Sequence, residues 1–228
     1  MLTSIFRAFR SLARTPGFAL VAILTLGLAL GAIGTVFAVV NAVLLKPLPY
    51  PGSERIIRIV GSQGACTDCP VARPVLFDWQ EQTTEAFESL GAFAGTSATL
   101  TGGEGAEKLE AYTVTPEFWR VMAVPAQLGR AFTADEDRAA RDVVVISNAL
   151  WQRAFGGARD VIGRKIVLNG EPHEIVGVMP EHFKYPGGDA WLPTQLASAT
   201  TGRDTNYLSV VARLREGVAL EQAERLMA

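Results

Sequence analysis

The chain has 228 residues, of which 49% are hydrophobic and 19% are charged, and its formal net charge is −2. This balance excludes a generally basic nucleic-acid-binding protein, because phosphate binding requires a clustered positive surface. The apolar content also excludes a disordered chain. Residues 1–46 contain four basic side chains and no acidic one, whereas residues 47–228 contain 17 basic and 23 acidic side chains. We therefore expect the two parts to lie in different surroundings.

A run of 31 residues without a charged side chain extends from Thr15 to Leu45. A bilayer core needs roughly 20 apolar helical residues, so residues 17–46 are predicted to form a transmembrane helix that ends at the prolines after it. A cleaved signal peptide is the alternative, but its apolar region is about 7–15 residues long. Three arginines precede the run. The positive-inside rule then places the N-terminus in the cytoplasm and residues 47–228 in the periplasm or another extracytoplasmic space.

Two further features accompany the predicted helix. Residues 1–16 are interpreted as a cytoplasmic basic amphipathic segment on the anionic leaflet, with a plain charged anchor as the alternative. Gly27 and Gly31 form a GxxxG pair, and Gly34 and Ala38 extend the small-residue face. These four residues are predicted to pack against another helix, because small side chains let two backbones approach closely. The alternative is that glycine and alanine are simply frequent in membrane helices.

Short strands and helices alternate irregularly after the prolines. Hydrophobic periodicity and turn residues predict strands at 55–60, 91–101, 108–115, 142–147, 165–168, 174–179 and 207–214. The same signals predict helices at 74–87, from 116, from 148 and at 219–228, with a loop at 61–70. We expect Thr115 and Asn148 to cap their helices, and Asn169-Gly170 to form a hairpin turn. This order favours an α+β fold with mainly antiparallel strands, and about 180 residues suffice for two small lobes.

Motifs for nucleotide binding or hydrolysis are absent, because the sequence contains no GxxxxGK[ST], GxSxG or HExxH. The two histidines, His173 and His182, are interpreted as surface residues, although a proton-shuttling role stays open. The acidic run Asp135–Asp137 could bind calcium, but a helix start neutralised by nearby arginines explains it better. We therefore predict no catalytic, cofactor-binding or metal site.

Cys66 and Cys69 form the only CxxC pair. A zinc site would need two more ligands at suitable spacing, and a redox site would need the first cysteine at a helix N-terminus. A local disulfide that stiffens the loop in an oxidising compartment is the favoured interpretation. Free thiols are the second one.

Several blocks of the sequence together resemble the MacB/FtsX type of ABC-transporter permease, and most closely its duplicated predicted-permease branch. The resemblance covers nearly the whole chain and includes the family's MacB-like periplasmic core domain. The blocks that carry it are residues 10–18, 41–50, 76–79, 114–119, 128–132, 150–157 and 175–180.

This resemblance implies a permease subunit in the inner membrane that is not itself an enzyme, since a separate ABC ATPase chain or domain hydrolyses ATP. Motion would pass along the first helix, with residues 46–49 coupling it to a two-lobed periplasmic core domain at 47–228. The implied partners are the lipid bilayer, the ATPase, further permease helices or a second permease unit, and a periplasmic adaptor. No nucleic acid and no cofactor are implied.

The family continues with three more membrane helices, so the chain, which stops inside a predicted helix, is interpreted as an N-terminal fragment. The main alternative is a stand-alone, single-span anchored binding or sensing module, which would not require the small-residue face. A membrane-anchored thiol oxidoreductase that uses Cys66 and Cys69 is a more remote hypothesis.

Overall fold

The structure is a computed structural model that describes residues 16–40, 50–63, 66–102, 105–196, 202 and 205–227. The chain divides into two compact units, Met1–Pro47 and Leu48–Ala228. Most of the predicted amphipathic segment and the predicted coupling residues 46–49 lie outside the described residues.

The described part of the first unit is a single helix, α2 (Pro16–Val40), with no acidic residue in its first turn and no basic residue in its last. Its large apolar side chains are exposed, and Leu28 reaches 79%. Within the described part of the chain, no helix is both long enough and apolar enough to cross a membrane. The membrane helix at 17–46 therefore stays a prediction.

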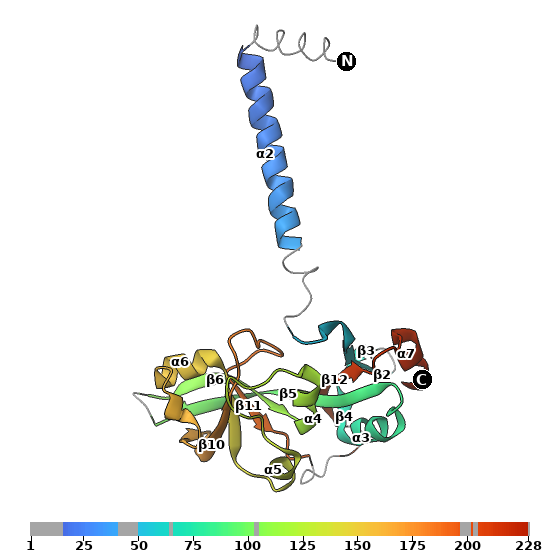
Figure 1. Ribbon diagram of the computed structural model, residues 1–228, viewed down its shortest axis with the longest axis vertical. Coiled ribbons are helices and arrows are strands. Elements are labelled where there is room, and N and C mark those ends of the chain that lie inside the picture. The colour runs from blue at the N-terminus through green and yellow to red at the C-terminus, as the bar shows by residue number, and fades with distance from the viewer. Residues whose placement is uncertain are drawn as a thin grey trace. The chain divides into compact units, whose positions relative to one another are not determined.

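The second unit is a mixed sheet with helices around it (Figure 1). Its strands are β1 (Ile56–Ile59), β2 (Gly61–Gln63), β3 (Cys66–Cys69), β4 (Val71–Ala72), β5 (Phe87–Thr101), β6 (Glu107–Val114), β7 (Leu128–Gly129), β8 (Val143–Ile146), β9 (Lys165–Leu168), β10 (Glu171–Val178), β11 (Ala190–Pro193) and β12 (Asn206–Leu214). Its α-helices are α3 (Arg73–Gln82), α4 (Pro116–Met122), α5 (Ala134–Arg138), α6 (Asn148–Phe155) and α7 (Leu220–Met227), and short 3-10 turns lie at Ser53–Arg55 and Arg159–Val161.

Six strands form a closed ring in the order β5, β6, β11, β8, β10 and β9, because β9 pairs with both β10 and β5. The β6–β11 and β8–β10 pairs are parallel, and the other pairs of the ring are antiparallel. Successive side chains of a strand point to opposite faces, so every ring strand buries alternate residues inside. One hydrophobic cluster fills this interior, with α6 contributing Leu150 and Trp151.

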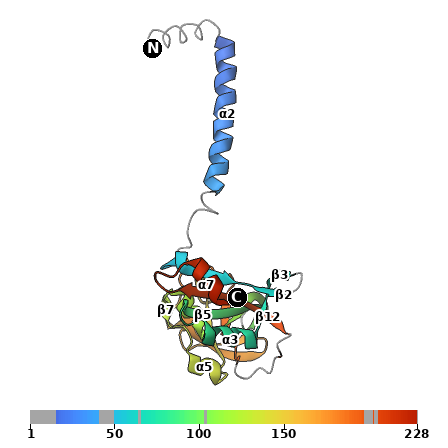
Figure 2. The same ribbon diagram turned by 90° about the vertical axis from the view of Figure 1, so that its right-hand side faces the viewer.

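The other half of the sheet consists of β1, β4, β12 and the first part of β5, which is therefore common to both halves. Alternate residues of β12 and β5 pack on one face of the sheet against α3 and α7. Figure 2 shows these two helices on the side of the domain that faces the viewer. Leu76 of α3 is fully buried there, and Ala223 of α7 is 1% exposed.

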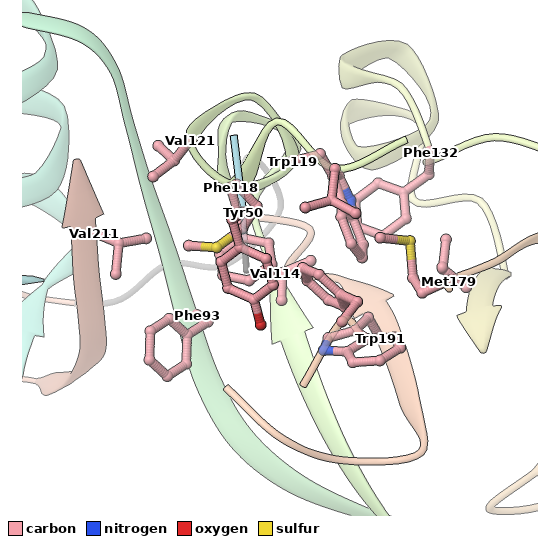
Figure 3. Close-up of a cluster of buried hydrophobic side chains, with 14 of the residues drawn as sticks. Tyr50, Phe93, Val114, Phe118, Trp119, Val121, Phe132, Met179, Trp191 and Val211 are labelled. Atoms are coloured by element: carbon pink, nitrogen blue, oxygen red, sulfur yellow. The ribbon is translucent and has the colours of Figure 1, made fainter. Parts of the chain in front are cut away.

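A third cluster is rich in aromatic rings and lies between α4 and the opposite face of the sheet (Figure 3). Phe118 and Trp119 of α4 point into it, and Trp119 lies 6.1 Å from Trp191 of β11 between ring centroids. The indole nitrogens of both tryptophans are buried without a hydrogen-bond acceptor. The packed rings therefore hold this side of α4 by apolar contact.

Most predicted elements are confirmed, including the hairpin turn, where Asn169 and Gly170 both have positive φ angles of 52° and 90°. The expected mixed α/β class with mainly antiparallel pairing also agrees with the described strands. The helix predicted at 74–87 ends instead at Gln82, because Phe87 starts β5 and pairs with Leu214 of β12.

Two local predictions were wrong, and a third was right in position only. Within the predicted loop at 61–70, residues 61–63 and 66–69 are strands, since β2 and β3 pair in a two-stranded sheet. The cap of α6 is Ser147 and not Asn148, because the Ser147 hydroxyl accepts a hydrogen bond from the Leu150 amide. Thr115 holds the N-cap position of α4 as predicted, but its hydroxyl oxygen accepts from the Ala92 amide of β5 and not from an amide of the helix.

Candidate interaction groove

The predicted helix-packing residues lie on α2. A Cβ atom added to Gly27, Gly31 or Gly34 would meet no atom within 4 Å, so this face is open in the single chain. Ala38 belongs to the same helix, but its side chain is outside the described part. The packing role of the four residues stays a prediction.

The two cysteines begin and end β3, and the β2–β3 pairing places Cys69 opposite Gly61. Cys69 is disulfide-bonded, and Cys66 is the only other cysteine in the sequence. A bond between them would link the two ends of β3.

The acidic run at 135–137 forms the first turn of α5. Thr133 and Glu136 make a reciprocal capping box, which satisfies free amides at a helix start. The Arg130 guanidinium, 2.7 Å from Glu136, lowers the pKa of that carboxyl to about 2. Among the described residues, no group of three His, Cys, Asp or Glu side chains has the geometry to hold a metal ion.

Two adjoining hollows on the domain surface, of about 220 and 480 Å³, were not predicted from the sequence. Both are lined by Gln80 of α3 and by Glu117 and Arg120 of α4, so we treat them as one α3–α4 groove. The larger hollow is also lined by Phe77, and its far wall includes Asp137 of α5.

The position of α4 in this groove is set by contacts to β5. The Ala92 amide donates to the Thr115 hydroxyl oxygen at 3.0 Å, and the Ser89 hydroxyl donates to the Glu117 carbonyl oxygen at 3.3 Å. The apolar side of α4 is buried in the aromatic cluster. Its charged side, with Arg120, is consequently left on the groove.

The α5 wall is tied to the chain that leaves β11. One oxygen of the Asp137 carboxylate accepts from the Gln195 amide at 2.8 Å and from the Thr194 hydroxyl at 3.4 Å. Burial raises the pKa of Asp137, although these hydrogen bonds act in the opposite direction. Gln195 has a positive φ of 50°, a conformation that a residue other than glycine adopts only when its surroundings hold it.

The groove thus offers charged, amide and aromatic side chains for non-covalent contacts. The sequence contained a local signal for only one part of this groove. Glu117 and Arg120 are separated by one helical turn, whereas Gln80 and Asp137 come from distant segments that only the folded sheet brings to the same surface.

The fold defines the class of the protein: a mixed α/β domain built around a closed ring of six strands. The structure of the periplasmic region of MacB from Actinobacillus actinomycetemcomitans matches it with a TM-score of 0.60 at 16% identity, covering 76% of this chain and 80% of the other. The extracellular domain of the noncanonic ABC-type transporter YknZ from Gram-positive bacteria matches with a TM-score of 0.54 at 17% identity, covering 75% and 86%. These likenesses concern the fold alone.

The family model of the MacB-like periplasmic core domain matches residues 19–228. The chain belongs to this family, and the resemblance to MacB/FtsX-type permeases is confirmed. The macrolide export ATP-binding/permease protein MacB of Shewanella sp. (strain ANA-3) is 30% identical over 148 residues, which are 60% of this chain and 22% of that protein. The protein of the same name from Hahella chejuensis is 29% identical over 119 residues, covering 49% and 18%. The chain therefore spans about a fifth of the length of these relatives.

Proposed function

We propose that this chain forms part of the permease subunit of an ABC-type exporter or mechanotransmission complex, in which a partner ATPase drives conformational change in the periplasmic domain. The observation that carries the proposal is the family match, which begins at residue 19 inside the apolar helix and continues through the whole domain. The names of the relatives support an ATPase partner, because they combine ATP binding with a permease.

The proposed location is the inner membrane, with residues 17–46 as a single span, residues 1–16 in the cytoplasm and residues 47–228 in the periplasm. The support comes from the sequence. The charge-free run at 15–45 is longer than the roughly 20 residues that a bilayer requires, and the arginines precede it.

Cysteine labelling tests this topology. In a chain without native cysteines, Ser4→Cys and Ala139→Cys are treated with a membrane-impermeant maleimide in spheroplasts and after lysis. We expect labelling of the second variant in both samples and of the first only after lysis. Labelling of the first variant in intact spheroplasts would overturn the orientation.

The small-residue face of α2 is proposed to pack against a further permease helix or a second copy of the unit, as Gly27 and Gly31 leave it open. The double substitution Gly27→Leu and Gly31→Leu should weaken co-purification of two differently tagged full chains by about fivefold or more. Ala29→Leu is the matched control, because it adds the same side chain to the opposite face. Equal association of all three proteins would contradict the packing role.

The ATPase partner is tested by purifying the tagged full chain from membranes of its native host and assaying the purified material for ATP hydrolysis. We expect hydrolysis that is sensitive to a Walker-motif substitution in the co-purified ATPase. Recovery of the chain without any ATPase would favour the single-span binding or sensing module.

A further inference from the structure

Arg213 is a charged side chain in the interior of the domain, 3% exposed. It lies on β12 opposite Ile56 of β1 and Ser89 of β5. Side chains alternate along a strand, so Arg213 shares the face of Val211, which packs in the aromatic cluster beneath α4. A hydrophobic residue would be expected at such a position.

The guanidinium makes four hydrogen bonds, all to main-chain carbonyl oxygens. Nε and Nη2 donate to the Val121 oxygen of α4 at 2.9 and 2.6 Å. Nη2 also donates to the Pro51 oxygen at 2.9 Å, and Nη1 donates to the Gly52 oxygen at 3.2 Å. One side chain thus joins a helix end to a segment about 70 positions earlier in the chain.

Both partners suit a cation. Val121 lies in the last turn of α4, where carbonyl groups have no partner within the helix and carry a partial negative charge. Burial lowers the pKa of Arg213, and the neighbouring Arg55 acts in the same direction. Burying a charge is unfavourable unless it is well hydrogen-bonded, so the bonds to these carbonyls are what hold the side chain inside.

The segment Tyr50–Gly52, called here the leading segment, is the first described part of the domain, and it follows the predicted membrane helix in sequence. The Tyr50 side chain is 6% exposed, its ring lies 5.6 Å from that of Phe183, and its hydroxyl oxygen accepts from the Lys184 amide at 3.0 Å. The leading segment is therefore fixed to the domain at Tyr50 as well as through Arg213.

We propose that Arg213 is a positioning residue that couples the leading segment to α4, so that a displacement of one is passed to the other and to the groove wall that Glu117 and Arg120 form. This inference rests on the proposed function, in which motion enters the domain from the membrane side. Without Arg213, the leading segment and α4 would lose their direct link and stay connected only through the aromatic cluster, in which Tyr50 and Trp119 both pack.

Gly52 provides an independent way to disturb the same contact. Its φ is +62°, and an added Cβ would lie 2.8 Å from Nη1 of Arg213. Gly52→Ala therefore strains the leading segment and pushes on the guanidinium. The backbone strain at residue 52 does not depend on Arg213, whereas the contact between the added Cβ and the guanidinium exists only when Arg213 is present.

The test is hydrogen exchange on the full chain in detergent, for the wild type, Gly52→Ala, Arg213→Gln and the double variant. The reporter of α4 is the Ala123 amide, bonded to the Trp119 oxygen, and the reporter of the leading segment is the Arg55 amide, bonded to the Gly52 oxygen. The Met179 amide, bonded to the Ile146 oxygen, reports opening of the strand ring.

When Arg213 is present, we expect Gly52→Ala to accelerate amide hydrogen exchange at both Ala123 and Arg55 by about tenfold relative to the wild type. In the Arg213→Gln background it should still accelerate Arg55 but change Ala123 by less than about twofold. Met179 should keep its rate in all four proteins, since loss of overall stability would raise its exchange as well.

Arg215→Gln is the matched control, because Arg215 is exposed and donates to the Thr84 oxygen; it should leave Ala123 unchanged. If Arg213→Gln does not fold, Arg213→Lys replaces it in the same cycle. An unchanged Ala123 rate in Gly52→Ala, or the same acceleration in both backgrounds, would overturn the coupling. The cycle needs no ATPase, so its failure is distinct from a failure of the proposed function.

Discussion

Gly129 and Gly177 face each other across the β7–β10 pair. A Cβ on Gly177 would lie 2.1 Å from the Arg130 carbonyl oxygen, and one on Gly129 would lie 2.2 Å from the Val176 oxygen. The Arg130 amide donates to that same Val176 oxygen at 2.9 Å. The two backbones are therefore as close as they are because both residues lack a side chain.

Gly177→Ala should destabilise the domain, because the Cβ contact requires the two strands to separate. We expect a loss of about 1–3 kcal/mol in the free energy of unfolding, measured by chemical denaturation of the full chain in detergent. The control is Gly105→Ala, where an added Cβ meets nothing within 4 Å. Equal stability of the two variants would refute the close-contact explanation.

Asp137 should tolerate an amide but not an apolar side chain. Asp137→Ala leaves the Gln195 amide without its acceptor and should lower the free energy of unfolding by about 1–3 kcal/mol. Asp137→Asn keeps an acceptor oxygen and removes a buried charge, so at pH 7 it should be at least as stable as the wild type. A large loss in both variants would show that the charge itself is needed.

The pH dependence at Asp137 follows from its raised pKa. The folded state binds the Asp137 carboxyl proton more tightly than the unfolded state does. The protonated carboxyl therefore stabilises the fold fully below the pKa of the unfolded state, and this stabilisation is lost as the pH rises through the pKa of the folded state. The stability advantage of Asp137→Asn over the wild type should therefore grow with rising pH in denaturation curves.

Glu136 has the opposite behaviour. Its pKa is lowered to about 2, mainly by the hydrogen bonds from Arg130, so it stabilises the fold above the ordinary value of 4.5 and loses this effect as the pH falls towards 2. Glu136→Gln should lower the free energy of unfolding by about 1–2 kcal/mol at pH 7, and the difference should shrink in acid. Asp135→Asn is the control; its carboxylate is 87% exposed, and we expect almost no change.

The cysteines of the β2–β3 hairpin should be oxidised to one intramolecular disulfide in the purified chain. The expected evidence is a mass 2 Da below that of the dithiol form and no alkylation without a reductant. Because the bond would close a loop of four residues, replacing Cys66 and Cys69 by serine should lower stability by about 2 kcal/mol or less. Two freely alkylated thiols in the native protein would contradict this pairing.

Local sequence features predicted the elements whose cause is itself local. Asn169-Gly170 determined a hairpin because both residues accept positive φ. The apolar run at 143–146 indicated a buried strand, and β8 is indeed buried on both faces, with alternate residues in different clusters. Phe87 was misassigned because helical spacing continued to it, whereas its pairing partner Leu214 is 127 positions away.

The α3–α4 groove could not be predicted in this way. Gln80, Arg120 and Asp137 belong to three segments, and their proximity depends on how α3, α4 and α5 are arranged around the sheet. The hydroxyl of Thr115 shows the same effect, since a residue suited to cap a helix is used to hold that helix against β5.

By itself, the sequence determined the charge partition between the apolar N-terminal part and the acidic domain, the positions of most strands and the family resemblance. These properties depend on composition and on neighbours a few residues apart. Only the tertiary structure decided that six strands close into a ring, that a groove lies beside α4 and that Arg213 is buried. Each of these features requires residues tens of positions apart to meet. Sequence alone predicts an arginine at the surface, because the carbonyl groups that hydrogen-bond its guanidinium come from distant segments.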